Sequence, residues 1–125
     1  MNVVDSCGWL EYFADGPNAD FFAGPIEATD DLCVPTVSLY EVFKRVLHQR
    51  GEGPALKAVA LMQQGTVVDL SAQLALAAAR LSEEFGLPMA DSIMLGTARA
   101  RGGMLVTQDA KFRDLPGVRY TTRQT

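Results

Sequence analysis

Four acidic side chains stand where a chain of alternating strands and helices collects ligands. Asp5 and Asp109 each follow a short apolar run, Asp91 opens a stretch with apolar residues at helical spacing, and Glu41 lies in an earlier helical stretch. Clustered carboxylates repel one another, so a hard divalent cation is a natural way to keep them ionised together. Oxygen ligands without His or Cys favour Mg²⁺ or Mn²⁺, which suit phosphoryl chemistry.

Each of these acids also has an ordinary structural explanation. Asp5 and Asp109 could cap the helix that follows each of them. Asp91 could complement a helix dipole, although it is aligned with apolar residues, and burying an unpaired carboxylate costs several kcal/mol. Glu41 could form an i,i+4 surface pair with Arg45. The pattern therefore gains its force from the four acids in combination.

Strands and helices are expected to alternate along the chain and to position these acids. Strands are expected at residues 2–5, 32–35, 66–70, 104–107 and 118–120. Helices are expected at residues 7–13, after Pro17, from Thr36 or Ser38 to about Arg50, over a stretch that has Pro54 in its first turn and ends near Gly65, from a Ser71 cap to Gly86, and from Pro88 to Gly102. The continuously apolar strands predict an α/β domain with a mainly parallel sheet, whose sites gather at the carboxyl ends of the strands.

Composition predicts one compact cytoplasmic domain. The 125 residues are 48% hydrophobic, and no apolar run is long enough to cross a membrane. Nothing near the N-terminus is typical of a signal peptide, and Cys7 and Cys33 are interpreted as reduced, buried thiols. One His and two Cys exclude a zinc motif.

The charge distribution is asymmetric. The net charge of −4 argues against general nucleic-acid binding through bulk electrostatics. However, residues 1–43 carry eight acids and no Lys or Arg, whereas residues 99–125 carry six basic residues against two acids. This asymmetry suggests a basic rim that could meet phosphate or an acidic partner.

Four stretches of the chain contain the four acids in order. They are VVDSCGWLEYF, PTVSLYEVFKRVL, LPMADSIMLGTAR and LVTQDAKFRDLPGV. In order, spacing and hydrophobic context they resemble the acidic motifs of PIN-domain ribonucleases, and most closely those of the VapC toxins of VapBC toxin–antitoxin systems. The resemblance extends over nearly the whole chain. It implies a single PIN-like domain over residues 1–125, a three-layer α/β/α fold with a mainly parallel sheet of four to five strands.

The resemblance also implies a function and a set of site residues. The expected reaction is metal-assisted hydrolysis of RNA phosphodiester bonds, carried out by a homodimer that a VapB-type antitoxin silences by entering the active-site groove. The acids expected to hold one or two Mg²⁺ or Mn²⁺ ions are Asp5, Glu41, Asp91 and Asp109, with Ser6 and Thr107 as supporting polar residues. The candidates for contacting RNA phosphates are Lys44, Arg45, Arg99 and Lys111.

Two other functions are compatible with parts of the sequence. A response-regulator receiver domain would use Asp69 as phosphoacceptor and Thr107 as switch hydroxyl. Against it, Asp5 is followed by Ser6 rather than by a second acid, and no Lys follows the expected strand at residues 118–120. Alternatively, a PIN-fold protein could act as a binding module without turnover. Such a module would show no metal-dependent gain in melting temperature.

Overall fold

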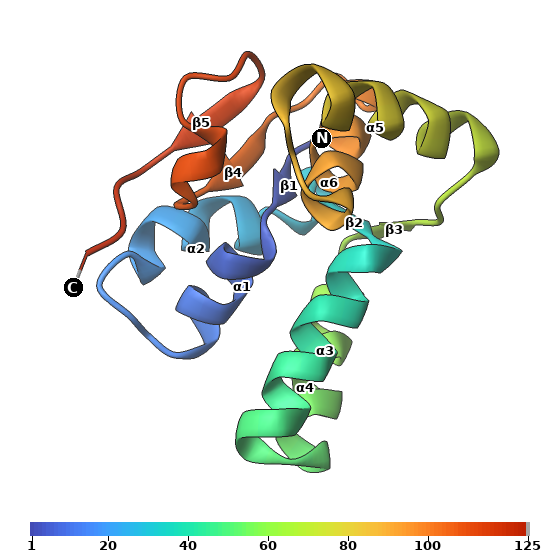
Figure 1. Ribbon diagram of the computed structural model, residues 1–125. Helices are drawn as coiled ribbons and strands as arrows, with labels where there is room; N and C mark the ends of the chain where they lie inside the picture. The colour runs from blue at the N-terminus through green and yellow to red at the C-terminus, as the bar shows by residue number, and fades with distance from the viewer. Residues whose placement is uncertain (125) are drawn as a thin grey trace.

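Five parallel strands run through the middle of the molecule. The computed structural model describes residues 1–124. Strands β1 (Val3–Val4), β4 (Leu105–Thr107) and β5 (Val118–Tyr120) form one sheet in the order β1-β4-β5, and β2 (Cys33–Pro35) pairs with β3 (Thr66–Val68). A single parallel bridge between Asn2 and Leu32 joins the two sheets. The spatial order is therefore β3-β2-β1-β4-β5, which confirms the expected parallel α/β architecture (Figure 1).

A pair of helices precedes each of the strands β2, β3 and β4, whereas a short 3₁₀ turn connects β4 to β5. The helices are α1 (Ser6–Phe13), α2 (Ala19–Glu27), α3 (Thr36–Arg50), α4 (Glu52–Met62), α5 (Ala72–Phe85) and α6 (Met89–Ala100), and the 3₁₀ turns are η1 (Thr29–Asp31) and η2 (Ala110–Phe112). None of the helices in residues 1–124 is long and apolar enough to cross a membrane.

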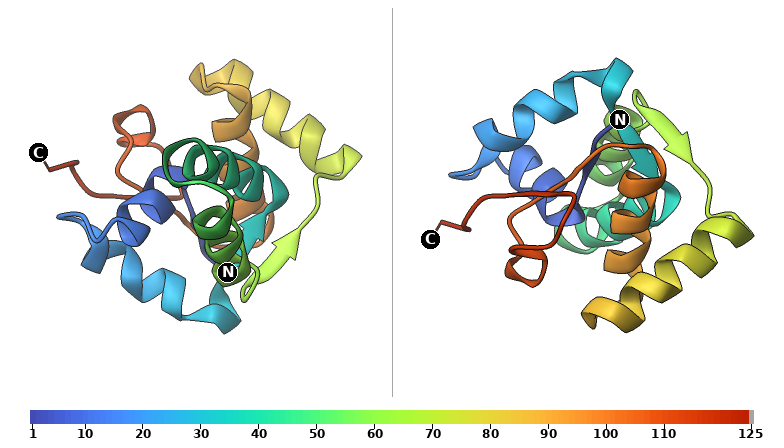
Figure 2. Two further views of the ribbon diagram at one scale, coloured as in Figure 1. Left: turned by 90° about the horizontal axis from the view of Figure 1, so that it is seen from below. Right: turned by 90° about the horizontal axis from the view of Figure 1, so that it is seen from above.

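Alternating strand residues supply two hydrophobic cores, one on each face of the sheet. Val4, Val34 and Val106 pack with apolar residues of α1 to α4. Val3, Cys33 and Leu105 pack with those of α5 and α6. Because successive side chains of a strand point to opposite faces, this alternation produces the expected three layers. Figure 2 shows α2 and α5 on opposite sides of the molecule.

Several element boundaries follow from local chemistry, and one expectation about them was wrong. The Ser71 hydroxyl accepts a hydrogen bond from the backbone N–H of Leu74, as expected for a helix cap. By contrast, neither Thr36 nor Ser38 caps α3, because the N-cap residue of that helix is Pro35. Helix α4 begins at Glu52 and has Pro54 in its first turn, as expected, since Pro is compatible with the first turn of a helix.

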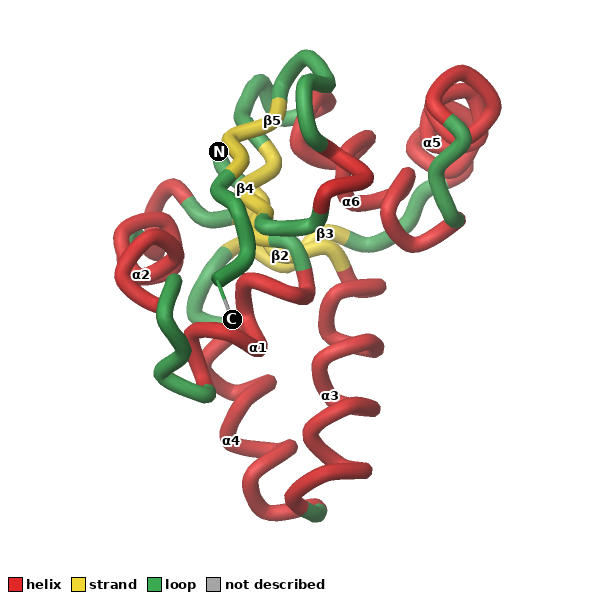
Figure 3. Tube along the Cα trace, turned by 60° about the vertical axis from the view of Figure 1, so that its left-hand side comes forward, coloured by secondary structure: helices red, strands yellow, loops and turns green. Residues whose placement is uncertain are grey.

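The α3–α4 pair extends away from the sheet. Figure 3 shows the two antiparallel helices side by side, with α3 beginning directly at the end of β2. The first turns of α3 therefore lie at the carboxyl edge of the sheet, and its later turns project beyond it. Helix α3 can therefore place residues of its first turns at the carboxyl edge of the sheet and residues of its later turns beyond that edge.

Candidate active site

Asp5 lies at the point where the strand order reverses. Counted outward from β1, strands β2 and β3 lie on one side and strands β4 and β5 on the other. A crevice therefore opens beyond the carboxyl ends of β1 and β4. Asp5 directly follows β1 and is only 3% exposed. Its Oδ2 accepts hydrogen bonds from Thr107 Oγ1 at 2.7 Å and from Cys7 Sγ at 3.2 Å.

Thr107 connects Asp5 to the loop that carries Asp109. Its hydroxyl donates to Asp5 and accepts from the backbone N–H of Asp109 at 2.9 Å. Thr107 is fully buried at the end of β4, so neither hydrogen bond is replaced easily by water. Thr107 therefore fixes the position of the carboxyl end of β1 relative to the carboxyl end of β4.

Asp91 and Asp109 share one cation, the ammonium group of Lys111. Lys111 Nζ lies 3.0 Å from Asp91 Oδ2 and 3.4 Å from Asp109 Oδ2. Asp91 lies in the first turn of α6, and its side chain is 13% exposed. Its Oδ2 is buried and has no hydrogen bond of good geometry, so the contact with Lys111 is purely an ion pair. Asp91 is thus a largely buried, paired carboxylate rather than a solvated one at a helix end.

Glu41 reaches the same pocket from α3 and is held by a different residue. Ser6 Oγ donates a hydrogen bond of 2.7 Å to Glu41 Oε1. Ser6 is buried in the first turn of α1, directly after Asp5. The start of α1 therefore supplies one acid of the pocket, Asp5, and the hydroxyl that orients a second acid, Glu41.

Burial and mutual repulsion perturb the ionisation of this cluster. Burial raises the pKa of Asp5 to about 6, the hydrogen bonds from Thr107 and Cys7 lower it, and the charges of Asp91 and Asp109 raise it. Burial, followed by the Asp5 charge, raises the pKa of the Cys7 thiol to about 12. Cys7 therefore remains a thiol at neutral pH and donates to Asp5.

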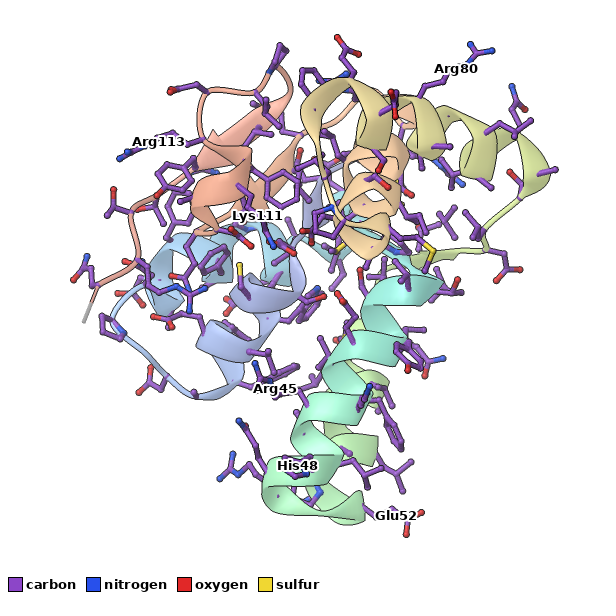
Figure 4. All side chains as sticks on the ribbon, in the orientation of Figure 1. Arg45, His48, Glu52, Arg80, Lys111 and Arg113 are labelled. Carbon is purple, nitrogen blue, oxygen red and sulfur yellow. The ribbon has the colours of Figure 1, made fainter. Side chains whose placement is uncertain are left out.

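A cavity of about 450 Å³ lies over the acids and is bordered by basic residues of α3. Its lining includes all four acids together with Ser6, Cys7, Leu10, Tyr40, Lys44, Arg45 and His48. Figure 4 shows Lys111 projecting from η2 toward the space between α1 and α6, and Arg45 reaching from α3 toward α1. The pocket thus has an acidic wall, formed by the four acids, and a basic wall, formed by Lys44, Arg45 and His48.

The structure brings together most of the residues that the sequence suggests, but not all. Arg99 does not line the pocket, because its guanidinium donates to the Pro116 carbonyl at 2.7 Å and stacks on Phe85. Asp69 is exposed after the edge strand β3, two strands away from β1.

Cys7 was misinterpreted as a buried hydrophobic residue, because its neighbours in sequence give no sign that its thiol faces the acids. Only its position two residues after Asp5, in the first turn of a helix, could have suggested this. Cys33 is buried as expected.

The donor set suits a hard divalent cation, and two of the four carboxylates, Asp91 and Asp109, are paired with Lys111. Four carboxylates supply oxygen ligands, and Asp91 Oδ2 is a buried acceptor without a hydrogen bond. Within residues 1–124, no three His, Cys, Asp or Glu side chains already form a group that could hold a metal ion. A divalent cation would therefore replace the contacts that Lys111 makes with Asp91 and Asp109.

Comparison with known proteins shows the family. The PIN domain family model matches residues 3–118, so the chain belongs to the PIN domain family. A search of curated proteins finds no significant match.

Several solved structures share the fold over nearly its full extent. A toxin–antitoxin complex from Klebsiella pneumoniae matches with a TM-score of 0.78 and 20% identity, covering 94% of this chain and 95% of the other. DNA-bound VapBC from Salmonella typhimurium matches with a TM-score of 0.75 and 18% identity, covering 98% and 97%. A VapC toxin from Mycobacterium tuberculosis that cleaves the sarcin-ricin loop matches with a TM-score of 0.66 and 15% identity, covering 82% and 84%. The chain therefore has the fold of the VapC toxins.

Proposed function

We propose that the protein is a VapC-type toxin, a Mg²⁺- or Mn²⁺-dependent endoribonuclease that hydrolyses RNA phosphodiester bonds. One observation carries the proposal: acids from four separate parts of the chain converge on one pocket, which basic residues of α3 also line. Membership of the PIN family and the shared fold with VapC toxins support it. A receiver domain is excluded by the family and by the position of Asp69, which follows the edge strand β3 and does not line the pocket.

The residues of the pocket have separate roles in this proposal. Asp5, Asp91 and Asp109 hold the metal, with Glu41 completing the set. When bound, Mg²⁺ or Mn²⁺ would polarise the scissile phosphate and promote ionisation of the attacking water. Thr107 favours the ionised form of Asp5 by donating to it.

The basic side of the pocket receives the RNA backbone in this proposal. Lys44 and Arg45 are exposed on α3 and border the cavity, where they would contact phosphate oxygens. Lys111 would join them once its ion pairs are broken. Arg99 is omitted from this set because it is engaged with Pro116.

We also propose which molecules the protein binds, from the complexes found among its structural neighbours. The solved neighbours include VapBC complexes, which supports a VapB-type antitoxin as the partner. We further propose a homodimer that acts on cytoplasmic RNA. Ribosomal RNA is the first substrate to test, since one structural neighbour cleaves the sarcin-ricin loop.

Cleavage of total cellular RNA by the purified, antitoxin-free protein tests the proposal. The reaction is run with Mg²⁺, with Mn²⁺ and with EDTA, beside Asp91→Asn and the matched control Asp69→Asn, which removes an exposed acid outside the pocket. We expect metal-dependent cleavage that Asp91→Asn lowers by at least about a hundredfold and Asp69→Asn leaves unchanged. Equal cleavage by the Asp91→Asn variant and the wild type would overturn the assignment.

A binding module without turnover is the second candidate. It is favoured by the ion pairs of Lys111, whose single positive charge offsets part of the negative charge of Asp91 and Asp109. Under this function, neither Mg²⁺ nor Mn²⁺ raises the melting temperature, whereas a metal site produces a gain that grows with metal concentration.

A further inference from the structure

Lys111 holds both acids of its ion pairs from a fixed backbone position. Its backbone N–H donates to Asp109 Oδ1 at 3.0 Å, while its Nζ contacts Asp109 Oδ2 and Asp91 Oδ2. The next residue, Phe112, is completely buried, and its N–H donates to the Asp109 carbonyl. The backbone of η2 is therefore anchored beside the acids.

The side chain of Lys111, unlike that of Asp91, is open to solvent. It is 51% exposed, whereas its partner Asp91 is 13% exposed. A lysine has a flexible four-carbon stem and a compact ammonium group, so it can leave two carboxylates by rotating about its side-chain bonds. Its departure needs no change in the backbone of η2 or α6.

Lys111 is also distinct from the other basic residues of the pocket. Within residues 1–124, no other Lys, Arg or His forms an ion pair with any of the four acids. Lys44 instead lies over the ring of Tyr40, with Nζ 5.7 Å from the ring centroid. The repulsion between Asp91 and Asp109 is thus offset by one side chain alone.

We propose that Lys111 is an internal counter-ion that holds the metal ligands Asp91 and Asp109 together before the metal arrives, and that it must be displaced for a divalent cation to bind. Lys111 then sets the metal affinity of the site without being a ligand itself. This inference rests on the proposed function, since it assumes that the two acids are metal ligands.

The proposal predicts opposite effects on the metal-free and the metal-bound protein. Removing the ammonium leaves two nearby carboxylates without a counter-ion, so the metal-free protein becomes less stable. The same change removes a competitor for the metal, so the affinity for the metal rises. A residue that merely stabilises the fold would lower the melting temperature without tightening metal binding.

Calorimetric titration of the antitoxin-free protein with Mn²⁺ tests the inference directly. Lys111→Met keeps the length of the side chain and removes its charge. The matched control Lys57→Met removes the same charge from exposed α4, outside the pocket. Lys111→Arg keeps the charge at the same position. Melting temperatures are measured for each variant in EDTA and in Mn²⁺.

For Lys111→Met we expect the Mn²⁺ Kd to fall about fivefold, because a half-exposed ion pair contributes modestly. We also expect a lower melting temperature in EDTA and a larger gain on adding Mn²⁺. Lys57→Met is expected to match the wild type, and Lys111→Arg to bind Mn²⁺ no more tightly than the wild type. Tighter binding by Lys111→Met alone supports the inference.

The outcomes separate this inference from the function on which it rests. Equal Mn²⁺ affinities for the wild type and Lys111→Met would overturn the role of Lys111 and leave the metal site in place. Absence of Mn²⁺ binding by both proteins would overturn the inference together with the metal-dependent function. Binding by Lys111→Met but not by the wild type would be its strongest support.

Discussion

The two sides of the pocket are built in different ways. The acidic wall, formed by Asp5, Glu41, Asp91 and Asp109, is held by hydrogen bonds from Ser6 and Thr107 and by the ion pairs of Lys111. The basic wall, formed by Lys44, Arg45 and His48, consists of exposed side chains on α3. One wall is ordered by buried contacts, and the other projects into solvent.

This difference matches the demands that each wall would meet in the proposed reaction. Metal ligands act only within a narrow range of positions, so the groups that orient them must be rigid. Phosphate contacts depend mainly on charge, and a mobile lysine or arginine satisfies them at many positions along an RNA backbone. We therefore expect the removal of a single hydrogen-bonding group to change the properties of the acidic wall. We expect the basic wall to be affected mainly by the removal of a charge.

The largest difference is expected from Asp5→Asn, a change that keeps the shape of the acidic wall. Because the pKa of Asp5 is raised to about 6 from 3.8, its contribution to stability is complete below pH 3.8 and is lost as the pH rises through about 6. Ionised Asp5 thus destabilises the metal-free fold at pH 7.5. We expect Asp5→Asn to raise the free energy of unfolding there by about 2 kcal/mol.

Urea unfolding in EDTA at pH 4, 5, 6 and 7.5 measures this effect. The advantage of Asp5→Asn is expected to shrink toward pH 4, where the wild-type carboxyl is largely protonated. Mn²⁺ is expected to narrow or reverse the difference at pH 7.5, since only the wild type retains the carboxylate. A variant less stable than the wild type in EDTA at pH 7.5 would contradict the interpretation of Asp5 as a buried acid whose ionised form destabilises the metal-free fold.

A smaller effect, and a different kind of effect, is expected from the basic wall. Lys44→Ala and Arg45→Ala are each expected to weaken RNA binding by about tenfold without changing metal affinity. Each change is also expected to reduce the slope of log K against log salt by about 0.7, the value for one phosphate contact on a single strand. Binding to RNA is measured in Ca²⁺ at several salt concentrations. An unchanged salt slope would remove the residue from the RNA contacts.

The smallest effect is expected where the acidic wall loses one hydrogen bond. Ser6→Ala removes the hydroxyl that donates to Glu41 and is expected to lower the free energy of unfolding by about 1 kcal/mol. Ser71→Ala is its matched control, because it removes a helix cap of similar value far from the pocket. Only Ser6→Ala is expected to weaken Mn²⁺ binding, by about twofold. Equal Mn²⁺ affinities of the two variants would show that Ser6 does not orient Glu41 for the metal.

Much of the fold is readable from local patterns. The apolar runs that end at Asp5 and Thr107 predict β1 and β4, and Ser71 and Gly86 mark both ends of α5, where Gly86 adopts the left-handed conformation with φ of 67°. The start of α3 was less predictable. Thr36 and Ser38 both have the side chain of a helix cap, but β2 leads directly into the helix at Pro35, and that choice depends on how the strand pairs.

Sequence alone determined the fold class, the order of the elements and the four acids, because strand alternation, helix caps and motif order are local properties of the chain. Only the tertiary structure decided which polar side chains meet. Lys111 contacts Asp91 on another element, Ser6 of α1 donates to Glu41 of α3, and Arg99 turns to the carbonyl of Pro116. The physical reason is that spacing along a helix or strand specifies neighbours within about one turn. The partner of a side chain across two elements depends on how the sheet and both helical layers pack.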